Sequence, residues 1–174
     1  MESISSHINS VITALGADTK TIELLLMALK DSQAGQIKLH DGASSEALVY
    51  LLKAHNEFST IPAARNLLGI TCADIAAAYA NLEEFRRAST FARDAIAIVR
   101  GNQMFAVTEG NANMTLANAL TSLGKTAEAE SHYECALEIF QRMPSGAQFL
   151  KALEHNRARL CLLRSNRRSW WKFW

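Results

Sequence analysis

Residues 110–143, GNANMTLANALTSLGKTAEAESHYECALEIFQRM, decide the fold of this chain. Apolar residues recur every three or four positions on both sides of Gly124, which predicts two amphipathic helices joined by a tight turn. The first helix has an apolar side made of Leu116, Ala117 and Leu120. The second helix has a stripe of small and large apolar residues: Ala129, Tyr133, Ala136, Leu137 and Phe140. The alanines in both stripes indicate that the two helices approach each other closely, as a helical hairpin.

The same small residues recur along the chain when the sequence is shifted by 41 positions, for example from Ala76 to Ala117. Four columns share this register: Gly35, Ala76, Ala117, Ala158; Ala47, Ala88, Ala129; Ala54, Ala95, Ala136; and, in the turn, Gly42, Glu83, Gly124. One hairpin cannot bury its apolar face alone, so repeated hairpins stack into a superhelix. We therefore expect three hairpins followed by a single terminal helix.

The repeat predicts an all-α protein in three parts. Residues 1–16 are expected to form a capping helix over the N-terminal end, and residues 17–164 to contain three helix pairs and the terminal helix. Residues 165–174 are expected to form a basic tail that is rich in tryptophan. The alternating pattern of β-branched residues that is typical of strands does not occur.

The composition of the 174-residue chain is that of one soluble globular domain. The net charge of +1 gives no electrostatic footprint for nucleic acid. The three cysteines lie far apart without paired spacing, so we expect no disulfide framework and a reducing, cytoplasmic compartment. The N-terminus lacks the pattern of a secretory signal, and no apolar run approaches the ~20 residues needed to span a bilayer.

No motif of catalysis or cofactor binding is found. Residues 16–21 end like a phosphate-binding loop, but Ala14 and Thr19 stand where its glycines belong. The five histidines lack the spacing of metal ligands, and Cys135, next to a packing alanine, is better explained as a structural thiol. We therefore expect no enzymatic activity, no cofactor and no metal site.

The third hairpin resembles a tetratricopeptide repeat (TPR). The large, small and aromatic positions of that motif are met by Leu116, Ala117, Leu120, Ala129, Tyr133 and Ala136, and in the second hairpin by Ile75, Ala76, Tyr79, Phe85, Ala88 and Ala95. The sequence departs from the motif at its tryptophan, replaced by Cys72 or Asn113, at its proline, displaced to Pro144, and at Lys38 in the first hairpin. The period exceeds the usual one of about 34 residues and is similar to the long-helix variety of kinesin light chains and bacterial peptide-sensing regulators. The resemblance implies a right-handed superhelix of antiparallel helix pairs.

The resemblance also implies a protein or peptide partner, bound in a concave groove lined by the first helix of each pair. In the third pair it places Asn111, Met114, Asn118 and Thr121 on that face. The register adds Ile70, Ala73, Ala77 and Ala80 in the second pair, Leu29, Ser32, Gln36 and Leu39 in the first, and Ala152, His155, Arg159 and Leu162 in the terminal helix.

Asn156 matches an asparagine used for peptide contact in the long-repeat variety, and we expect Asn118, Asn156 and Arg159 to bracket an extended peptide. The alternative is that these residues are ordinary polar surface residues. A carboxylate clamp for chaperone tails is incomplete, since Ala73, Ala77 and Met114 stand where it needs lysine or asparagine. This departure disfavours an Hsp70 or Hsp90 co-chaperone.

The last residues contain all three tryptophans, with the aromatic set Trp170, Trp171, Phe173 and Trp174. Exposed, such a cluster marks an interface. Three interpretations stay open: a cap on the last helix or on a neighbouring subunit, a docking motif for another protein, or a contact with a membrane interface, which the short length disfavours. The alternative to a peptide-binding module is therefore a self-assembling structural subunit, a homo-oligomer joined through the tail or the end helices.

Overall fold

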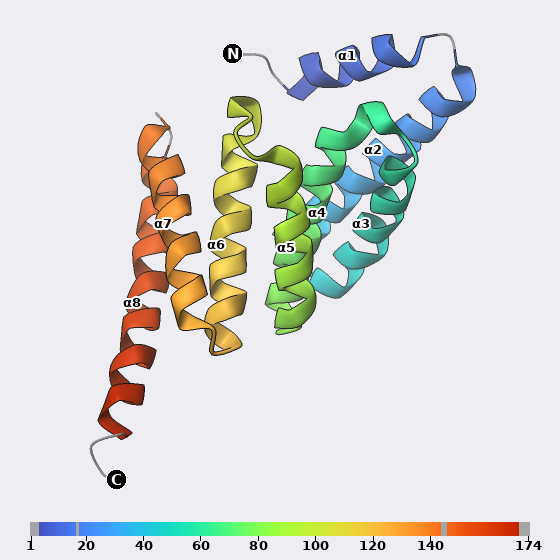
Figure 1. Cartoon of the computed structure of the whole chain (residues 1–174). Coiled ribbons are helices and arrows are strands. Elements are labelled where there is room, and N and C mark those ends of the chain that lie inside the picture. Colours follow the sequence, from blue (N-terminus) through green and yellow to red (C-terminus); the bar gives the residue numbers. More distant parts are fainter. Residues whose placement is uncertain (1–3, 17, 144–145, 171–174) are drawn as a thin grey trace.

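The computed structural model describes residues 4–16, 18–143 and 146–170, and within these residues all regular structure is helical (Figure 1). The elements are α1 (Ile4–Leu15), α2 (Thr19–His40), α3 (Ser44–Ser59), η1 (Pro62–Ala64), α4 (Arg65–Asn81), α5 (Phe85–Val99), η2 (Gln103–Phe105), α6 (Ala106–Ser122), α7 (Thr126–Arg142) and α8 (Ala147–Trp170). Helices α2–α3, α4–α5 and α6–α7 form three antiparallel pairs, and α8 packs against α7. The fold is the expected all-α, TPR-like right-handed superhelix.

The turn within each pair is set by one residue in the left-handed conformation. Gly42, Glu83 and Gly124 have φ angles of 78°, 60° and 76°. In each turn the amide of the next residue donates to the carbonyl five positions back at 2.9 Å: Ala43 to Lys38, Glu84 to Tyr79, and Lys125 to Leu120. This closure ends the first helix of each pair, and it favours glycine because a Cβ is strained at positive φ. The turn column of the sequence register therefore marks the same left-handed turn in each pair. At Glu83, the member that is not glycine, the backbone is strained.

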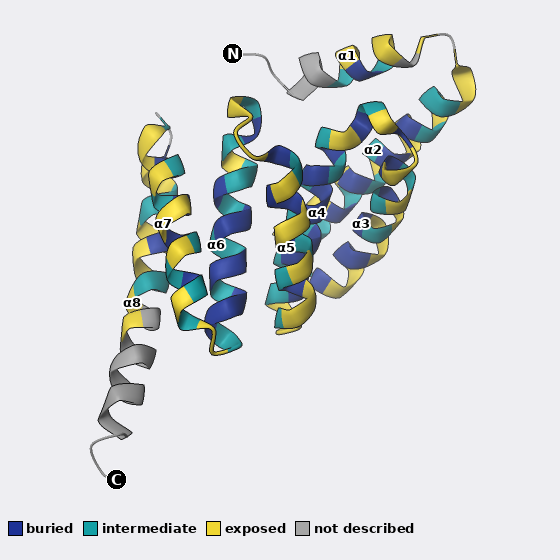
Figure 2. Cartoon of the chain, viewed as in Figure 1, coloured by how far each residue is buried: buried dark blue, intermediate teal, exposed yellow. Residues whose placement is uncertain are grey.

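The helix pairs pack through their small residues. The two alanine columns of the second helices, at positions 47, 88 and 129 and at positions 54, 95 and 136, are all 0% exposed. Gly110 lets α6 approach α7 closely, because a Cβ at this position would lie 2.4 Å from the ring of Phe140. Gly69 holds the equivalent place on α4, where a Cβ would lie 2.7 Å from Ile98 and Val99. Figure 2 shows the buried residues on the helix sides that face neighbouring helices.

Helix α1 lies across the N-terminal end of the stack (Figure 1), where it contacts α2 and η1. Its Val11 is 3% exposed and joins a buried cluster with Leu25, Phe58 and Ile61. This packing follows from the apolar side of α1, whose Ile8 and Ile12 also touch the cluster. The assignment of residues 1–16 as a separate capping element remains a prediction.

Helix α8 is longer than predicted. The sequence placed its end near Arg164, whereas the helix continues to Trp170. No glycine or proline occurs between these residues to stop it. Trp171, Phe173 and Trp174 lie outside the described residues, as do the side chains of Arg159 and Trp170. None of the helices in the described ranges combines the length and apolar character that crossing a membrane requires.

Candidate functional site

Two adjoining cavities lie along the first helices of the pairs. The larger, of about 520 Å³, is lined mainly by α2 and α4. Its lining includes the apolar residues Leu26, Leu29, Phe58 and Leu67 and the polar residues Lys30, Ser32, Gln33 and Gln36. The smaller, of about 250 Å³, lies between α4 and α6. Ile70 lines both. Together they adjoin three helices, α2, α4 and α6, each the first of its pair.

Several predicted groove residues line these cavities. In the smaller cavity Asn111 and Met114 of α6 face Ile70, Ala73 and Ala77 of α4. Leu29, Ser32 and Gln36 of α2 line the larger one. The 41-residue register therefore brings equivalent positions of successive helices together around a shared hollow.

Thr121 does not take part in this face. Its side chain is buried, with 4% exposure, and its hydroxyl donates to the carbonyl of Ala117 at 2.7 Å. The prediction that Thr121 faces a ligand is wrong, because its side chain is buried and its hydroxyl is already bonded within α6. Asn118, one turn earlier, is half-buried, and its Oδ1 accepts a hydrogen bond from the Tyr133 hydroxyl at 2.6 Å. A substitution of Asn118 therefore disturbs the hairpin itself.

The predicted residues of α8 lie apart from both cavities. His155 is exposed and Asn156 is half-buried, and neither lines either hollow. The side chain of Arg159 is outside the described residues. The structure thus joins Asn111 and Met114 in one site but does not bring the α8 residues to it.

Asp74 is the charged residue of the smaller cavity, and the sequence reasoning missed it. Gln36 Nε2 of α2 donates to Asp74 Oδ2 at 2.8 Å. Burial raises the pKa of the Asp74 carboxyl to about 6, against the lowering effect of the Gln36 hydrogen bond. A signal was present in the register: Asp74 stands in a polar column with Gln33, Thr115 and Asn156.

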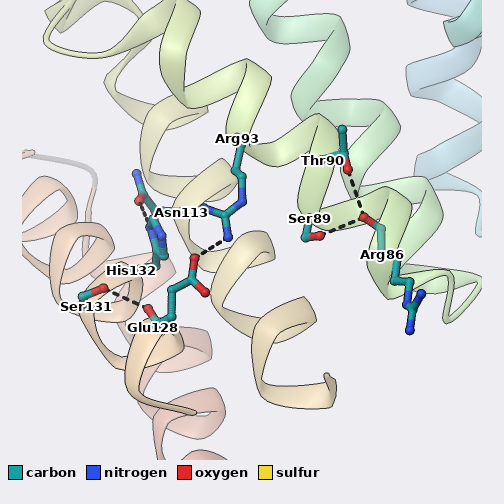
Figure 3. A network of polar contacts seen from close by, with 8 residues as sticks. All are labelled: Arg86, Ser89, Thr90, Arg93, Asn113, Glu128, Ser131 and His132. Atoms are coloured by element: carbon teal, nitrogen blue, oxygen red, sulfur yellow. Dashed lines mark hydrogen bonds and ion pairs between the residues drawn. The ribbon is translucent and has the colours of Figure 1, made fainter. Parts of the chain in front are cut away.

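A polar network links α5, α6 and α7 (Figure 3). Arg93 on α5 pairs with Glu128 on α7, and this hydrogen bond lowers the pKa of the Glu128 carboxyl. His132 Nδ1 lies 2.9 Å from Oδ1 of the buried Asn113, and burial followed by the Arg93 charge lowers the pKa of the imidazole. Asn113 also donates to the carbonyl of Glu109 at 2.9 Å. Hydrogen bonding at Asn113 thus replaces the aromatic packing of the TPR motif, and the network is structural.

The buried cysteine has the character of a packing residue. Cys72 is 1% exposed in the core between the second and third pairs. Burial raises the pKa of its thiol to about 12, which keeps the thiol protonated and unreactive near neutral pH. Over the described ranges, no three histidine, cysteine or acidic side chains gather closely enough to hold a metal ion.

Comparison with known proteins identifies the repeat. Residues 114–143, which cover the second half of α6 and all of α7, match the family model described as tetratricopeptide repeat. The first TPR domain of the human RPAP3 protein is similar in structure, with 22% identity, a TM-score of 0.54, and coverage of 78% of this chain and 96% of that one. The first TPR of Spaghetti (RPAP3) bound to the HSP90 peptide SRMEEVD is similar with 20% identity, a TM-score of 0.50, and coverage of 76% and 94%. No curated protein matches the chain. These likenesses show a TPR fold.

Proposed function

We propose that this protein is an interaction module that binds a protein or peptide segment along the face formed by α2, α4 and α6. The observation that carries the proposal is the pair of adjoining cavities that share Ile70. The peptide bound to the Spaghetti TPR is in keeping with such a role for a chain of this fold. The 41-residue register further supports the long-helix variety of the repeat.

The chemistry of the smaller cavity suits an extended peptide. Ala73 and Ala77 leave room for a backbone to approach α4, while Met114 offers an adaptable apolar surface. The Asn111 amide has both a donor and an acceptor for peptide groups. The smaller cavity carries the carboxylate of Asp74 and no cation among its lining residues, which argues against an acidic chaperone tail as the ligand. We propose that a bound segment longer than the two cavities also contacts α8, at His155 and Asn156, which lie beyond both cavities.

We expect the double substitution Asn111→Ala and Met114→Ala to weaken peptide binding about fivefold or more, because it removes one hydrogen-bonding group and one apolar contact worth about 1 kcal/mol together. Peptides are first selected on the full chain from a random phage-displayed library. Their affinities are then measured by fluorescence anisotropy. The control is Ser131→Ala, on the exposed side of α7. Unchanged affinity in the double variant, with the same peptides, contradicts the proposed face.

A further inference from the structure

The smaller cavity is built to receive a cationic side chain, an inference that rests on the proposed function. Gln36 donates a hydrogen bond to Oδ2 of Asp74. Among the described residues, none forms a hydrogen bond or an ion pair with Oδ1 of Asp74. Ile70, Ala73 and Met114 supply apolar surface around the carboxylate. A lysine or arginine lays its aliphatic stem on such walls while its charged end reaches a carboxylate. The cavity volume of about 250 Å³ accommodates one such side chain.

The larger cavity has a different character. Its walls combine aliphatic and aromatic side chains, Leu29, Phe58 and Leu67 among them, with the polar side chains of Ser32, Gln33 and Gln36, and its volume is about 520 Å³. Its cation, Lys30, is exposed, so the ammonium group keeps its contact with water. Such a hollow suits an aromatic side chain. The two cavities together therefore select a segment that carries aromatic and basic residues close together.

The C-terminal segment has this composition, and the charge of the chain is unevenly distributed around it. Residues 155–174 carry six basic residues and no acidic one, a charge of +6. Residues 1–154 carry twelve basic and seventeen acidic residues, a charge of −5. All three tryptophans lie within residues 170–174, together with Lys172. The end of the chain is thus complementary, in charge and in aromatic content, to the hollow formed by the other helices.

We propose that residues 164–174 of a second copy of this chain occupy the groove, with a basic side chain on Asp74 and a tryptophan in the larger cavity. A second copy is favoured over the same chain because α8 remains helical to Trp170 and extends past the ends of α6 and α7 (Figure 1). The four residues beyond it span at most about 14 Å. The positive segment of one copy is attracted to the negative remainder of the other, and salt weakens this attraction.

Tryptophan fluorescence of the unmodified full chain tests this directly, because every tryptophan lies in the proposed ligand. We expect the emission maximum to shift to shorter wavelength as protein concentration rises, with a parallel rise in mass by light scattering. Added salt is expected to reverse both changes. An emission maximum that does not depend on concentration, or a mass that stays monomeric throughout, overturns the proposal.

The Asp74→Asn variant tests whether the second copy contacts the Asp74 carboxylate. This variant keeps an acceptor for Gln36 and removes the charge, so we expect about a tenfold weaker self-association, the loss of one charge-assisted contact. Asp94→Asn, on the exposed side of α5, makes the same chemical change away from the cavities and is expected to associate normally. Equal association of both variants overturns the assignment to Asp74.

A labelled peptide of residues 164–174 separates this inference from the proposed function. We expect it to bind the full chain and to lose affinity in Asp74→Asn. If library peptides bind through Asn111 and Met114 while this peptide does not bind, the groove remains the proposed binding surface. The second copy is then excluded as its occupant. If neither kind of peptide binds, both proposals fail.

Discussion

Replacing Phe140 with alanine is expected to lower the free energy of unfolding by about 3–5 kcal/mol. The Phe140 ring is 0% exposed and stacks on Phe149 of α8 with 4.7 Å between ring centroids. It also fills the space opposite Gly110, where α6 has no side chain to replace it. The substitution therefore leaves a cavity that neither neighbouring helix can close, at the junction of α6, α7 and α8.

Urea unfolding followed by circular dichroism at the helical band measures this loss. Tyr50→Ala is the matched control, because Tyr50 is an aromatic residue with 37% exposure on α3. We expect the control to lose less than about 1 kcal/mol. A loss at Phe140 no greater than that of the control contradicts the packing of α8 onto the last helix pair.

Asp74→Asn is expected to stabilise the fold by about 2 kcal/mol above pH 7, after a discount for the partial exposure of the side chain. The folded-state pKa of the Asp74 carboxyl is about 6, whereas the unburied carboxyl has 3.8. Between these values the folded state holds the proton more tightly than the unfolded state does. The free energy of unfolding therefore falls as pH rises from about 4 to about 6, and the cost is fully present above that window. The substitution removes a charge that burial disfavours.

Thermal unfolding of the wild type, Asp74→Asn and the control Asp94→Asn, each from pH 4 to pH 8, checks this prediction. The stabilisation is expected only in Asp74→Asn and only at the higher pH values. If Asp74→Asn is less stable than the wild type at pH 8, the charged Asp74 carboxylate does not destabilise the fold, contrary to this prediction. A costly charge kept beside a cavity is a common signature of function, since activity and stability often trade against each other.

The fold was predictable because local rules repeat. The turn column of Gly42, Glu83 and Gly124 reflects the demand for positive φ, and the alanine columns reflect close helix packing. Both requirements act on single positions, so they are visible in a shifted sequence. The polar face was partly predictable for the same reason, since the register brings Asn111 and Met114 beside Ile70 and Ala73.

Other features depend on neighbours that a periodic pattern does not specify. Thr121 shares the helical spacing of the groove residues, but its side chain is buried and bonded to the carbonyl of Ala117. Asp74 looks like an ordinary polar surface residue until Gln36 of another pair is placed beside it. The end of α8 differs from the prediction because the basic, aromatic composition of residues 165–174 is typical of a tail, whereas residues 165–170 contain no glycine or proline to end the helix.

The most direct test of the groove as the binding surface is an NMR map of backbone amide shifts in the full chain, with and without a selected peptide. We expect the largest changes on the facing sides of α4 and α6, around Ala73, Asp74, Asn111 and Met114. Smaller changes are expected on α2, around Gln36. Changes confined to α3, α5 and α7, the second helices of the pairs, would contradict the groove as the binding surface.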